Sequence, residues 1–348
     1  MNFAEKLCRP ELLELVPYQS ARRTASGGRV WLNANESPWN NTNIEGVNRY
    51  PDCQPPALRK AYADYANLGT DNVLITRGAD EGIELLIRTF CVPGKDKVVS
   101  LTPSYGMYRI SALTCGVGYQ AVPWASEFTL PAELVEEGKE AKLVFVCNPN
   151  NPTGTVVNQT QLLELVSSIP NTLVVVDEAY IEFCPDQTVA SKLAEFPNLV
   201  VLRTLSKAFA LAGARCGFVL ANQKIIAVLE KVIAPYPVPV PVSAVSEEAL
   251  STSGIYHMKE QVGELNTLRQ QLVETLRQLP CVGKVPDSQG NFVIFEVKQA
   301  DTLYDKLKAK GILLRTYSAL PGWLRISIGN KEEMTELVEE LKKVSSTA

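Results

Sequence analysis

The sequence has one histidine among its 348 residues, and this scarcity excludes several kinds of active site. Zinc sites built on paired histidines cannot form with a single imidazole. A hydrolase with a Ser-His-Asp or Cys-His arrangement would have to use His257. That residue lies in the polar segment Tyr256-His257-Met258-Lys259-Glu260, where a surface position on a charged helix is expected. Proton transfer must then rely on another group, and a lysine of lowered pKa is the available candidate.

Long apolar runs, paired cysteines and excess positive charge are also lacking. No run approaches the length of a membrane-spanning helix, and the N-terminus, which mixes acid and base, is not typical of a secretory signal. The 8 cysteines are scattered without a Cys-x-x-Cys pair, which favours reduced, buried thiols. A net charge of -4 argues against general nucleic-acid binding. We therefore expect a cytoplasmic protein without a membrane or nucleic-acid partner.

What the chain does contain is an alternation of short apolar runs and amphipathic segments. With 46% hydrophobic residues, the sequence can form a large domain and a smaller one. Continuous apolar runs are typical of strands buried on both faces, so they predict an α/β fold with a mostly parallel sheet covered by helices. The predicted strands are residues 73–76, 98–101, 142–147, 173–176 and 199–202, and an amphipathic helix is predicted over 81–90.

The pattern changes at Ala234-Pro235-Tyr236-Pro237-Val238-Pro239-Val240-Pro241, where a proline occupies every second position. Such a segment predicts a stiff connector between domains. A long helix is expected after it, from about residue 245 to 279, followed by strands at 291–297 and 323–328 and a helix over 331–344. We predict a large domain of residues 46–239 and a smaller α+β domain of residues 1–45 and 240–348.

Lys207 and Asp177 are the residues that suggest chemistry. A lysine preceded along the chain by a lone aspartate on an apolar strand is what pyridoxal phosphate requires: an amine for its aldehyde and an anion for its ring nitrogen. A partly desolvated Lys207 should have a lowered pKa, form the Schiff base and then carry the substrate proton. The hydroxyl of Tyr180 and the amide of Asn151 are candidate partners of the ring oxygen.

Other residues could bind the phosphate, the ring and a substrate anion. Two hydroxyls and a guanidinium near Lys207 suit a phosphate, as does the helix start that contains Ala79 and Asp80, where Asp80 is also a candidate N-cap. Tyr105 could stack on a flat ring, and Arg325 could bind a carboxylate or phosphate, although either could be structural. The hydroxyl and guanidinium residues are Thr204, Ser206 and Arg215.

These motifs, in order, resemble the fold-type I pyridoxal phosphate aminotransferases. The core motifs are Asn151-Pro152-Thr153-Gly154, Asp177-Glu178-Ala179-Tyr180 and Ser206-Lys207 followed by Arg215. Longer strings resemble the histidinol-phosphate aminotransferases of the class II subfamily. They are Pro17-Tyr18-Gln19-Ser20-Ala21-Arg22, Trp31-Leu32-Asn33-Ala34-Asn35-Glu36, Arg49-Tyr50-Pro51, residues 77–88 and residues 203–213.

The resemblance implies a fold, an assembly and a reaction. The fold has a seven-stranded sheet, and the enzyme is a homodimer in which Tyr50 reaches the cofactor phosphate of the neighbouring subunit and Tyr18 closes over its substrate. Asn33 joins the substrate-binding residues. Arg325, with Arg315 nearby, binds the phosphate of histidinol phosphate and then the carboxylate of glutamate or 2-oxoglutarate.

Three other functions are compatible with these residues. An aromatic amino acid aminotransferase would use the same cofactor site, and a threonine-phosphate decarboxylase would use the same lysine and arginines but release carbon dioxide. A cofactor-dependent transcription regulator of this fold would need an added DNA-binding domain, for which we expect no room before Pro17.

Overall fold

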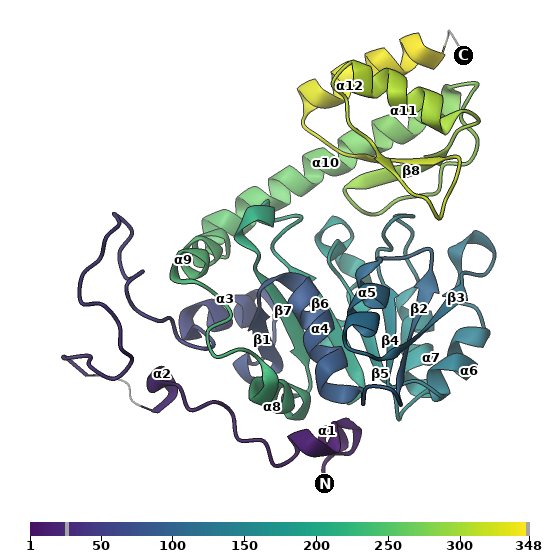
Figure 1. Ribbon diagram of the computed structural model, residues 1–348. Coiled ribbons are helices and arrows are strands. Elements are labelled where there is room, and N and C mark those ends of the chain that lie inside the picture. Colours follow the sequence, from purple (N-terminus) through teal and green to yellow (C-terminus); the bar gives the residue numbers. More distant parts are fainter. Residues whose placement is uncertain (25–27, 346–348) are drawn as a thin grey trace.

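The computed structural model describes residues 1–24 and 28–345, which form a large body, a smaller one and an extended N-terminal arm, residues 15–24 and 28–50 (Figure 1). A seven-stranded sheet forms the centre of the large body. Its strands, in spatial order, are β1 (Val73–Thr76), β7 (Gly217–Ala221), β6 (Leu199–Thr204), β5 (Leu173–Asp177), β4 (Leu143–Cys147), β2 (Lys97–Thr102) and β3 (Gly118–Pro123). The five strands from β3 to β6 are parallel, whereas β7 is antiparallel to both neighbours. The mostly parallel α/β sheet is therefore confirmed.

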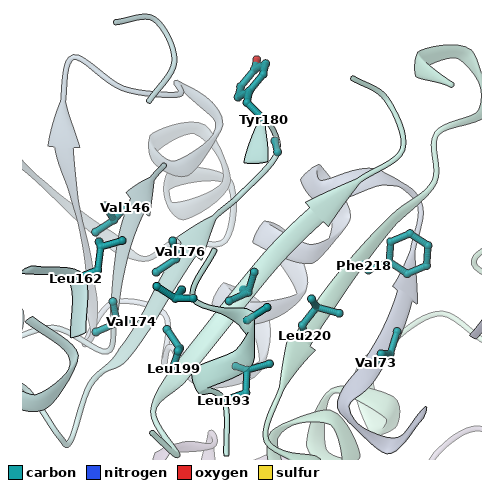
Figure 2. Packing of buried hydrophobic residues seen from close by; sticks show 14 of the residues in the cluster. Val73, Val146, Leu162, Val174, Val176, Tyr180, Leu193, Leu199, Phe218 and Leu220 are labelled. Atoms are coloured by element: carbon teal, nitrogen blue, oxygen red, sulfur yellow. The ribbon is translucent and has the colours of Figure 1, made fainter. Parts of the chain in front are cut away.

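Both faces of this sheet are covered, which explains why its strands are continuously apolar. Side chains of a strand alternate between faces. Val144 and Val146 pack into one core and Phe145 into the other. Figure 2 shows the first of these cores, with Val146, Val174 and Val176 side by side on neighbouring strands.

The helices divide between the two faces. The first core contains residues of α3 (Pro56–Ala66), α6 (Glu133–Lys139), α7 (Gln159–Ser168), α9 (Val240–Ala249) and the first half of α10 (Thr252–Gln278). The second contains residues of α1 (Phe3–Leu7), α4 (Gly78–Phe90), α5 (Met107–Thr114) and α8 (Gln223–Val232). A further short helix is α2 (Ala21–Thr24), and the 3-10 turns are η1 (Pro10–Leu12), η2 (Thr70–Asn72), η3 (Ser126–Phe128), η4 (Ile181–Phe183), η5 (Pro185–Gln187), η6 (Ala190–Lys192) and η7 (Ala212–Ala214).

The small body is a three-stranded antiparallel sheet covered by helices. Its strand order is β8 (Phe292–Glu296), β10 (Trp323–Ser327) and β9 (Arg315–Thr316). Helices α11 (Ala300–Ala309) and α12 (Lys331–Ser345) pack with the second half of α10 around a separate core. Helix α10 runs from the large body into the small one and joins them (Figure 1).

The single helix expected from residue 245 to 279 is instead two helices. Helix α9 ends at Ala249, and Ser251 caps α10 by accepting a hydrogen bond from the N–H of Gly254. The alternating prolines end in α9 rather than before it, since Pro241 lies in its first turn. Proline is tolerated at this position because the N–H groups of the first helical turn have no intrahelical acceptor, so the N–H that proline lacks costs no hydrogen bond.

The structure also places the N-terminal residues differently from the expected domain division. Ala4 and Leu7 of α1 are buried in the second core of the large body, against α8, because they form the apolar side of a short helix. At the other boundary, Met258 and Val262 still pack into the large body, and the core of the small body begins with Leu268. The two cores thus separate within α10 and not at residue 240.

The expected surface position of His257 is confirmed. His257 is exposed on α10. No helix of the described residues is both long and apolar enough to span a membrane.

Candidate active site

The chemically distinctive residues gather where the parallel strands end. Asp177 is the last residue of β5, Thr204 is the last residue of β6, and Lys207 follows three residues later. The Asn-Pro-Thr-Gly turn follows β4. Tyr180 projects beyond the end of β5 at the same edge (Figure 2). In open α/β sheets, ligands bind in the crevice at these carboxyl ends.

Asp177 is a buried carboxylate with only hydrogen bonds for support. It is 2% exposed, accepts a hydrogen bond of 2.7 Å from the hydroxyl of Tyr108, and accepts another of 3.1 Å from the N–H of Ala179. Burial raises the pKa of the Asp177 carboxyl to about 6, although these two hydrogen bonds oppose the shift. A cation bound beside this carboxylate would therefore be stabilised strongly.

Lys207 is the nucleophile candidate, and its surroundings favour the neutral amine. Burial, followed by the charge of Arg325, lowers the pKa of its ammonium group. The negative charges of Asp177 and Asp80 oppose this shift. The Nζ atom lies 5.5 Å from the ring centroid of Tyr180. A neutral amine near neutral pH is what attack on a carbonyl requires.

An anion-binding corner lies between the first turn of α4 and the segment after β6. Arg215 forms an ion pair of 3.0 Å with Asp80 and donates a hydrogen bond of 3.4 Å to Ser206, whose hydroxyl accepts one of 2.9 Å from Thr204. Gly78 has φ +79°, and a Cβ there would lie 3.0 Å from the guanidinium of Arg215. The glycine thus lets the first backbone N–H groups of α4, including that of Ala79, open toward the corner.

The structural role expected for Asp80 is wrong. The N-cap of α4 is Arg77, and Asp80 lies inside the first turn. Its carboxylate accepts a hydrogen bond of 2.8 Å from the hydroxyl of Tyr105 and pairs with Arg215. Asp80 is the third residue of α4 and so lies beyond the capping position.

Arg325 points from the small body toward the large one. It lies in the middle of β10, and its Nη1 donates a hydrogen bond of 2.7 Å to Oδ1 of Asn151. The amide of Asn151 donates one of 3.4 Å to the hydroxyl of Tyr180. The Nε of Arg325 is buried and has no hydrogen-bond partner within residues 1–24 and 28–345. This buried, unsatisfied donor suits an incoming anion.

Arg315 lies directly opposite Arg325, on β9. Tyr317 connects the two, since its ring centroid lies 5.8 Å from Cζ of Arg315 and 5.7 Å from Cζ of Arg325. Burial raises the pKa of the Tyr317 hydroxyl. The small body thus presents two guanidinium groups and one phenol on the same side of a sheet.

Three predicted residues lie elsewhere in the chain, on the N-terminal arm. Tyr18 and Tyr50 are 68% and 49% exposed, and Asn33 is also exposed. Tyr50 stacks on Tyr236 with centroids 4.5 Å apart. The arm extends from the side of the large body, apart from the strand ends (Figure 1).

Comparison with known proteins identifies the family to which the chain belongs. Residues 25–341 match the model of "Aminotransferase class I and II". The chain belongs to the class I and II aminotransferases. It is similar to the histidinol-phosphate aminotransferase of Shewanella oneidensis, with 51% identity over 97% of this chain and 88% of that one. The enzyme of the same name from Escherichia coli is 46% identical over 97% of both chains.

A solved structure agrees with this assignment. Histidinol-phosphate aminotransferase from Sinorhizobium meliloti, in complex with pyridoxal-5'-phosphate, superposes with a TM-score of 0.79 at 26% identity. The match covers 86% of this chain and 84% of that one. The seven-stranded sheet and the helices on its two faces are thus those of the aminotransferase fold.

Pyridoxal phosphate is the cofactor of this aminotransferase, and the residues present fit it. The buried Asp177 has hydrogen bonds but forms no ion pair with another described residue, as a carboxylate that receives a pyridinium should. The glycine at position 78 leaves backbone N–H groups open beside Arg215, as a phosphate requires.

Sequence reasoning missed two side chains of the aminotransferase site. Tyr108 directly contacts Asp177, and Tyr317 lies between the two arginines. Tyr108 lies three residues after Tyr105, one helical turn onward in the segment that enters α5, and this spacing was the available signal. No comparable signal marks Tyr317, because its partners lie on different strands.

Proposed function

We propose that this aminotransferase moves the amino group of L-histidinol phosphate to 2-oxoglutarate. The products are 3-(imidazol-4-yl)-2-oxopropyl phosphate and L-glutamate, and the step belongs to histidine biosynthesis. The observation that carries the proposal is the gathering of Lys207, the buried Asp177 and Asn151, which accepts a hydrogen bond of 2.7 Å from Arg325, at the carboxyl ends of neighbouring strands. The support for the substrate is the name shared by relatives that match 97% of the chain.

When bound, pyridoxal phosphate supplies an aldehyde and a protonated ring that withdraws electrons from the substrate Cα. Asp177 would hold the proton on the ring nitrogen, and Tyr108 would hold Asp177 in place. Asn151 and Tyr180 would donate to the ring oxygen, and Tyr105 would lie against the ring face. Ser206, Thr204, Arg215 and the N–H groups of Ala79 and Asp80 would bind the phosphate.

Lys207 would both attach the cofactor and carry the proton. Its neutral amine can attack an aldehyde, and once released it can accept the proton from the substrate Cα. The same amine can return that proton to the adjacent carbon. Because the carboxylates of Asp177 and Asp80 already have roles in binding the cofactor, Lys207 is the residue assigned to this proton transfer.

Arg325 would bind the anionic group of each substrate in turn. A guanidinium matches a phosphate and a carboxylate equally well. Its buried Nε and the nearby Arg315 provide further donors for histidinol phosphate. Tyr18 and Asn33 complete the proposed substrate-binding set.

A homodimer is part of the proposal. The arm carries large apolar side chains in contact with water: Val16 is 69%, Leu32 is 88% and Trp39 is 75% exposed. Exposed apolar side chains gathered in one segment are typical of an association surface. Glu36 fixes the arm internally by binding Arg22 at 3.0 Å and Arg49 at 2.9 Å. A second copy would cover this surface and receive Tyr50 at its cofactor phosphate.

A cytoplasmic location is also proposed. Cys8, Cys53, Cys91, Cys115, Cys147, Cys184 and Cys216 are free thiols, as in proteins of reducing compartments. The proposed small-molecule partners are phosphate esters and glutarate-like dicarboxylates, which Arg315 and Arg325 could bind. The proposal includes no nucleic-acid partner and no membrane partner.

The decisive experiment mixes the purified holoenzyme with L-histidinol phosphate and 2-oxoglutarate and follows glutamate. Borohydride reduction and peptide mapping should then locate the cofactor on Lys207, and Lys207→Ala should abolish turnover. The decarboxylase alternative predicts no glutamate and carbon dioxide from threonine phosphate. An aromatic aminotransferase would prefer phenylalanine or tyrosine to histidinol phosphate when kcat/KM values are compared.

A further inference from the structure

One turn of α10, where the helix passes from the large to the small body, carries a buried arginine. Arg269 is 5% exposed, and its Nη1 donates to the carbonyl of Gly290 at 2.9 Å and to Oδ1 of Asn266 at 2.5 Å. Its Nη2 donates to the side chain of Gln289 at 3.5 Å. No carboxylate within residues 1–24 and 28–345 forms an ion pair with it.

Such a residue is costly for stability. Burial lowers the pKa of the Arg269 guanidinium, because neutral carbonyl and amide oxygens compensate the lost hydration only in part. An aliphatic side chain would fill the same space without that cost. What an arginine adds is a rigid, forked set of donors that holds several backbone and side-chain oxygens at once.

Asn266 lies one turn earlier on the same side of α10 and contacts the other body. Its amide donates a hydrogen bond of 3.2 Å to the carbonyl of Phe183 in η4, the turn that follows Tyr180. Its oxygen is the one that Arg269 binds. Together the two side chains connect a segment of the large body to the 288–291 loop of the small body.

This loop is packed directly against the Asn-Pro-Thr-Gly turn. The N–H of Gln289 donates to the carbonyl of Gly154 at 2.7 Å. Gly154 has φ +74°, and a Cβ there would overlap the hydroxyl of Ser288 and come within 2.9 Å of its Cα. The loop thus rests on the turn that carries Asn151.

The 288–291 loop leads directly into Phe292, whose ring lies against the guanidinium of Arg325. Ser288 donates to the carbonyl of Phe292 at 2.5 Å. The ring of Phe292 lies 5.1 Å from Cζ of Arg325, and its centroid lies 5.0 Å from that of Tyr180. A shift of the loop would therefore move the aromatic ring on which the Arg325 guanidinium rests.

We propose that Arg269, together with Asn266, is a positioning residue for substrate anions: it holds the 288–291 loop against Gly154 and thereby fixes Arg325 over Asn151. This inference rests on the proposed function, in which Arg325 binds the substrate anion. Neither Arg269 nor Asn266 touches the cofactor or the substrate. Their effect is on the geometry of the guanidinium that does.

The test compares the holoenzymes of Arg269→Met, Arg269→Lys, Asn266→Ala and Arg325→Met. The matched control is Arg277→Met, two turns further along α10, which removes an exposed ion pair of 2.6 Å with Asp287. Glutarate, a dicarboxylate that cannot exchange an amine, is titrated by calorimetry, and its Kd is compared with kcat and KM for both substrates. The visible absorption of each unliganded holoenzyme and its thermal midpoint are recorded alongside.

We expect the Kd of glutarate and both KM values to rise about 10- to 100-fold in Arg269→Met, because a small misplacement of a binding group has effects of this size. Asn266→Ala should raise them less, and Arg269→Lys should recover part of the loss. The absorption spectrum should be unchanged, as should every value in the control. If Arg269→Met does not fold, Arg269→Lys and Asn266→Ala carry the test.

Two failures are distinguishable. If Arg325→Met binds glutarate as the wild type does, the assignment of Arg325 in the proposed function is wrong. If Arg325→Met loses binding while the Arg269 and Asn266 variants keep it and lose only thermal stability, the positioning role is overturned.

Discussion

At the residue scale, the buried carboxylate of Asp177 illustrates a conflict between the stability of the cofactor-free protein and the binding of a ligand. Its two hydrogen bonds, from Tyr108 and Ala179, do not offset its removal from water, and its pKa is raised from 3.8 to about 6. The site is therefore prepared for a cation that forms an ion pair with Asp177, which no residue of the described ranges does. In the proposed function, binding of the cofactor would recover this cost.

Tyr108 should control the charge on Asp177. In Tyr108→Phe the carboxylate loses a hydrogen bond to a charged acceptor, worth about 1.5–3 kcal/mol. The pKa of Asp177 should then rise further, because the hydroxyl favours the ionised form. We expect kcat to fall about tenfold, given about 1.36 kcal/mol per factor of ten, and the acid limb of the pH–rate profile to move to higher pH. Profiles of kcat and kcat/KM against pH measure both effects.

The control for this variant is Tyr119→Phe. That tyrosine hydroxyl shares a hydrogen bond of 2.8 Å with the hydroxyl of Ser100, a neutral partner at the edge of the sheet. It should lower stability slightly and leave the pH profile unchanged. Equal profiles for the two variants would show that Tyr108 is only a core residue.

Asp177→Asn should inactivate the enzyme and yet stabilise the cofactor-free protein above neutral pH. A carboxyl whose pKa is higher in the folded state binds protons there more tightly, so it favours folding below about pH 4 and loses that contribution as the pH rises toward 6. At pH 8 the asparagine should gain about 1–3 kcal/mol, since each tenfold difference in proton affinity corresponds to about 1.4 kcal/mol. Urea unfolding of the cofactor-free proteins at pH 4 and pH 8 checks this, and a gain that is equal at both values would contradict it.

At the element scale, a buried ion-pair network joins the ends of β5 and β6. Arg203, the residue before Thr204, contacts Glu178 at 2.7 Å and Glu182 at 3.3 Å, and all three side chains are no more than 7% exposed. Glu178 directly follows Asp177 in the sequence. The network therefore holds in register the two strand ends that carry Asp177 and Thr204.

Arg203→Met should destabilise the protein severely. It leaves two buried carboxylates without their cation, and removal of one partner from such a network costs about 3–5 kcal/mol. Burial already raises the pKa of Glu182 to about 7, so the loss of Arg203 should raise it further. Equilibrium unfolding in urea gives the change in stability. Lys192→Met, which removes an exposed ion pair of 2.8 Å, is the matched control and should cost less than about 1 kcal/mol.

The elements found from the sequence are those whose signal is local. The apolar runs predicted β4 and β5 within a residue or two, because strands buried on both faces need no alternation. Strand β3 was missed because it is an edge strand in which only Val122 is buried, so it lacks a continuous apolar run. Strand β7 was missed as well, and its antiparallel direction follows from pairing that no local pattern contains.

The site residues show the same division. Lys207, Asp177 and Asn151 are proposed from the sequence because their order along the chain is characteristic, and the structure places each of them at or after the carboxyl end of a strand. Tyr108 has only its spacing from Tyr105 as a signal, and Arg269 has none, because their partners lie 69 and 21 residues away along the chain. The expected domain boundary at residue 240 rests on a local signal of the same kind, the proline-rich segment, whereas the two buried clusters divide within α10.

At the scale of the whole molecule, the described chain has two bodies that each contain an apolar core, and an N-terminal arm that has no apolar core of its own. The arm from Leu15 to Tyr50 exposes nine large apolar residues: Leu15, Val16, Tyr18, Val30, Leu32, Trp39, Ile44, Val47 and Tyr50. A monomer with this surface would be prone to association. The proposed dimer resolves the difficulty, because a symmetric partner covers the same arm on both copies.

If Tyr50 acts on the neighbouring subunit, two inactive variants should complement each other. Tyr50→Ala lacks the donated residue, and Lys207→Ala lacks the cofactor-linked amine. A mixed dimer then has one site with both defects and one with neither. After equimolar mixing and subunit exchange, half the dimers are mixed and half their sites are intact, so about a quarter of the wild-type activity should return. Glutamate formation before and after exchange measures it, with each variant incubated alone as the control. If Tyr50 acted within its own subunit, every mixed site would keep one defect, and the mixture would stay as inactive as its parts.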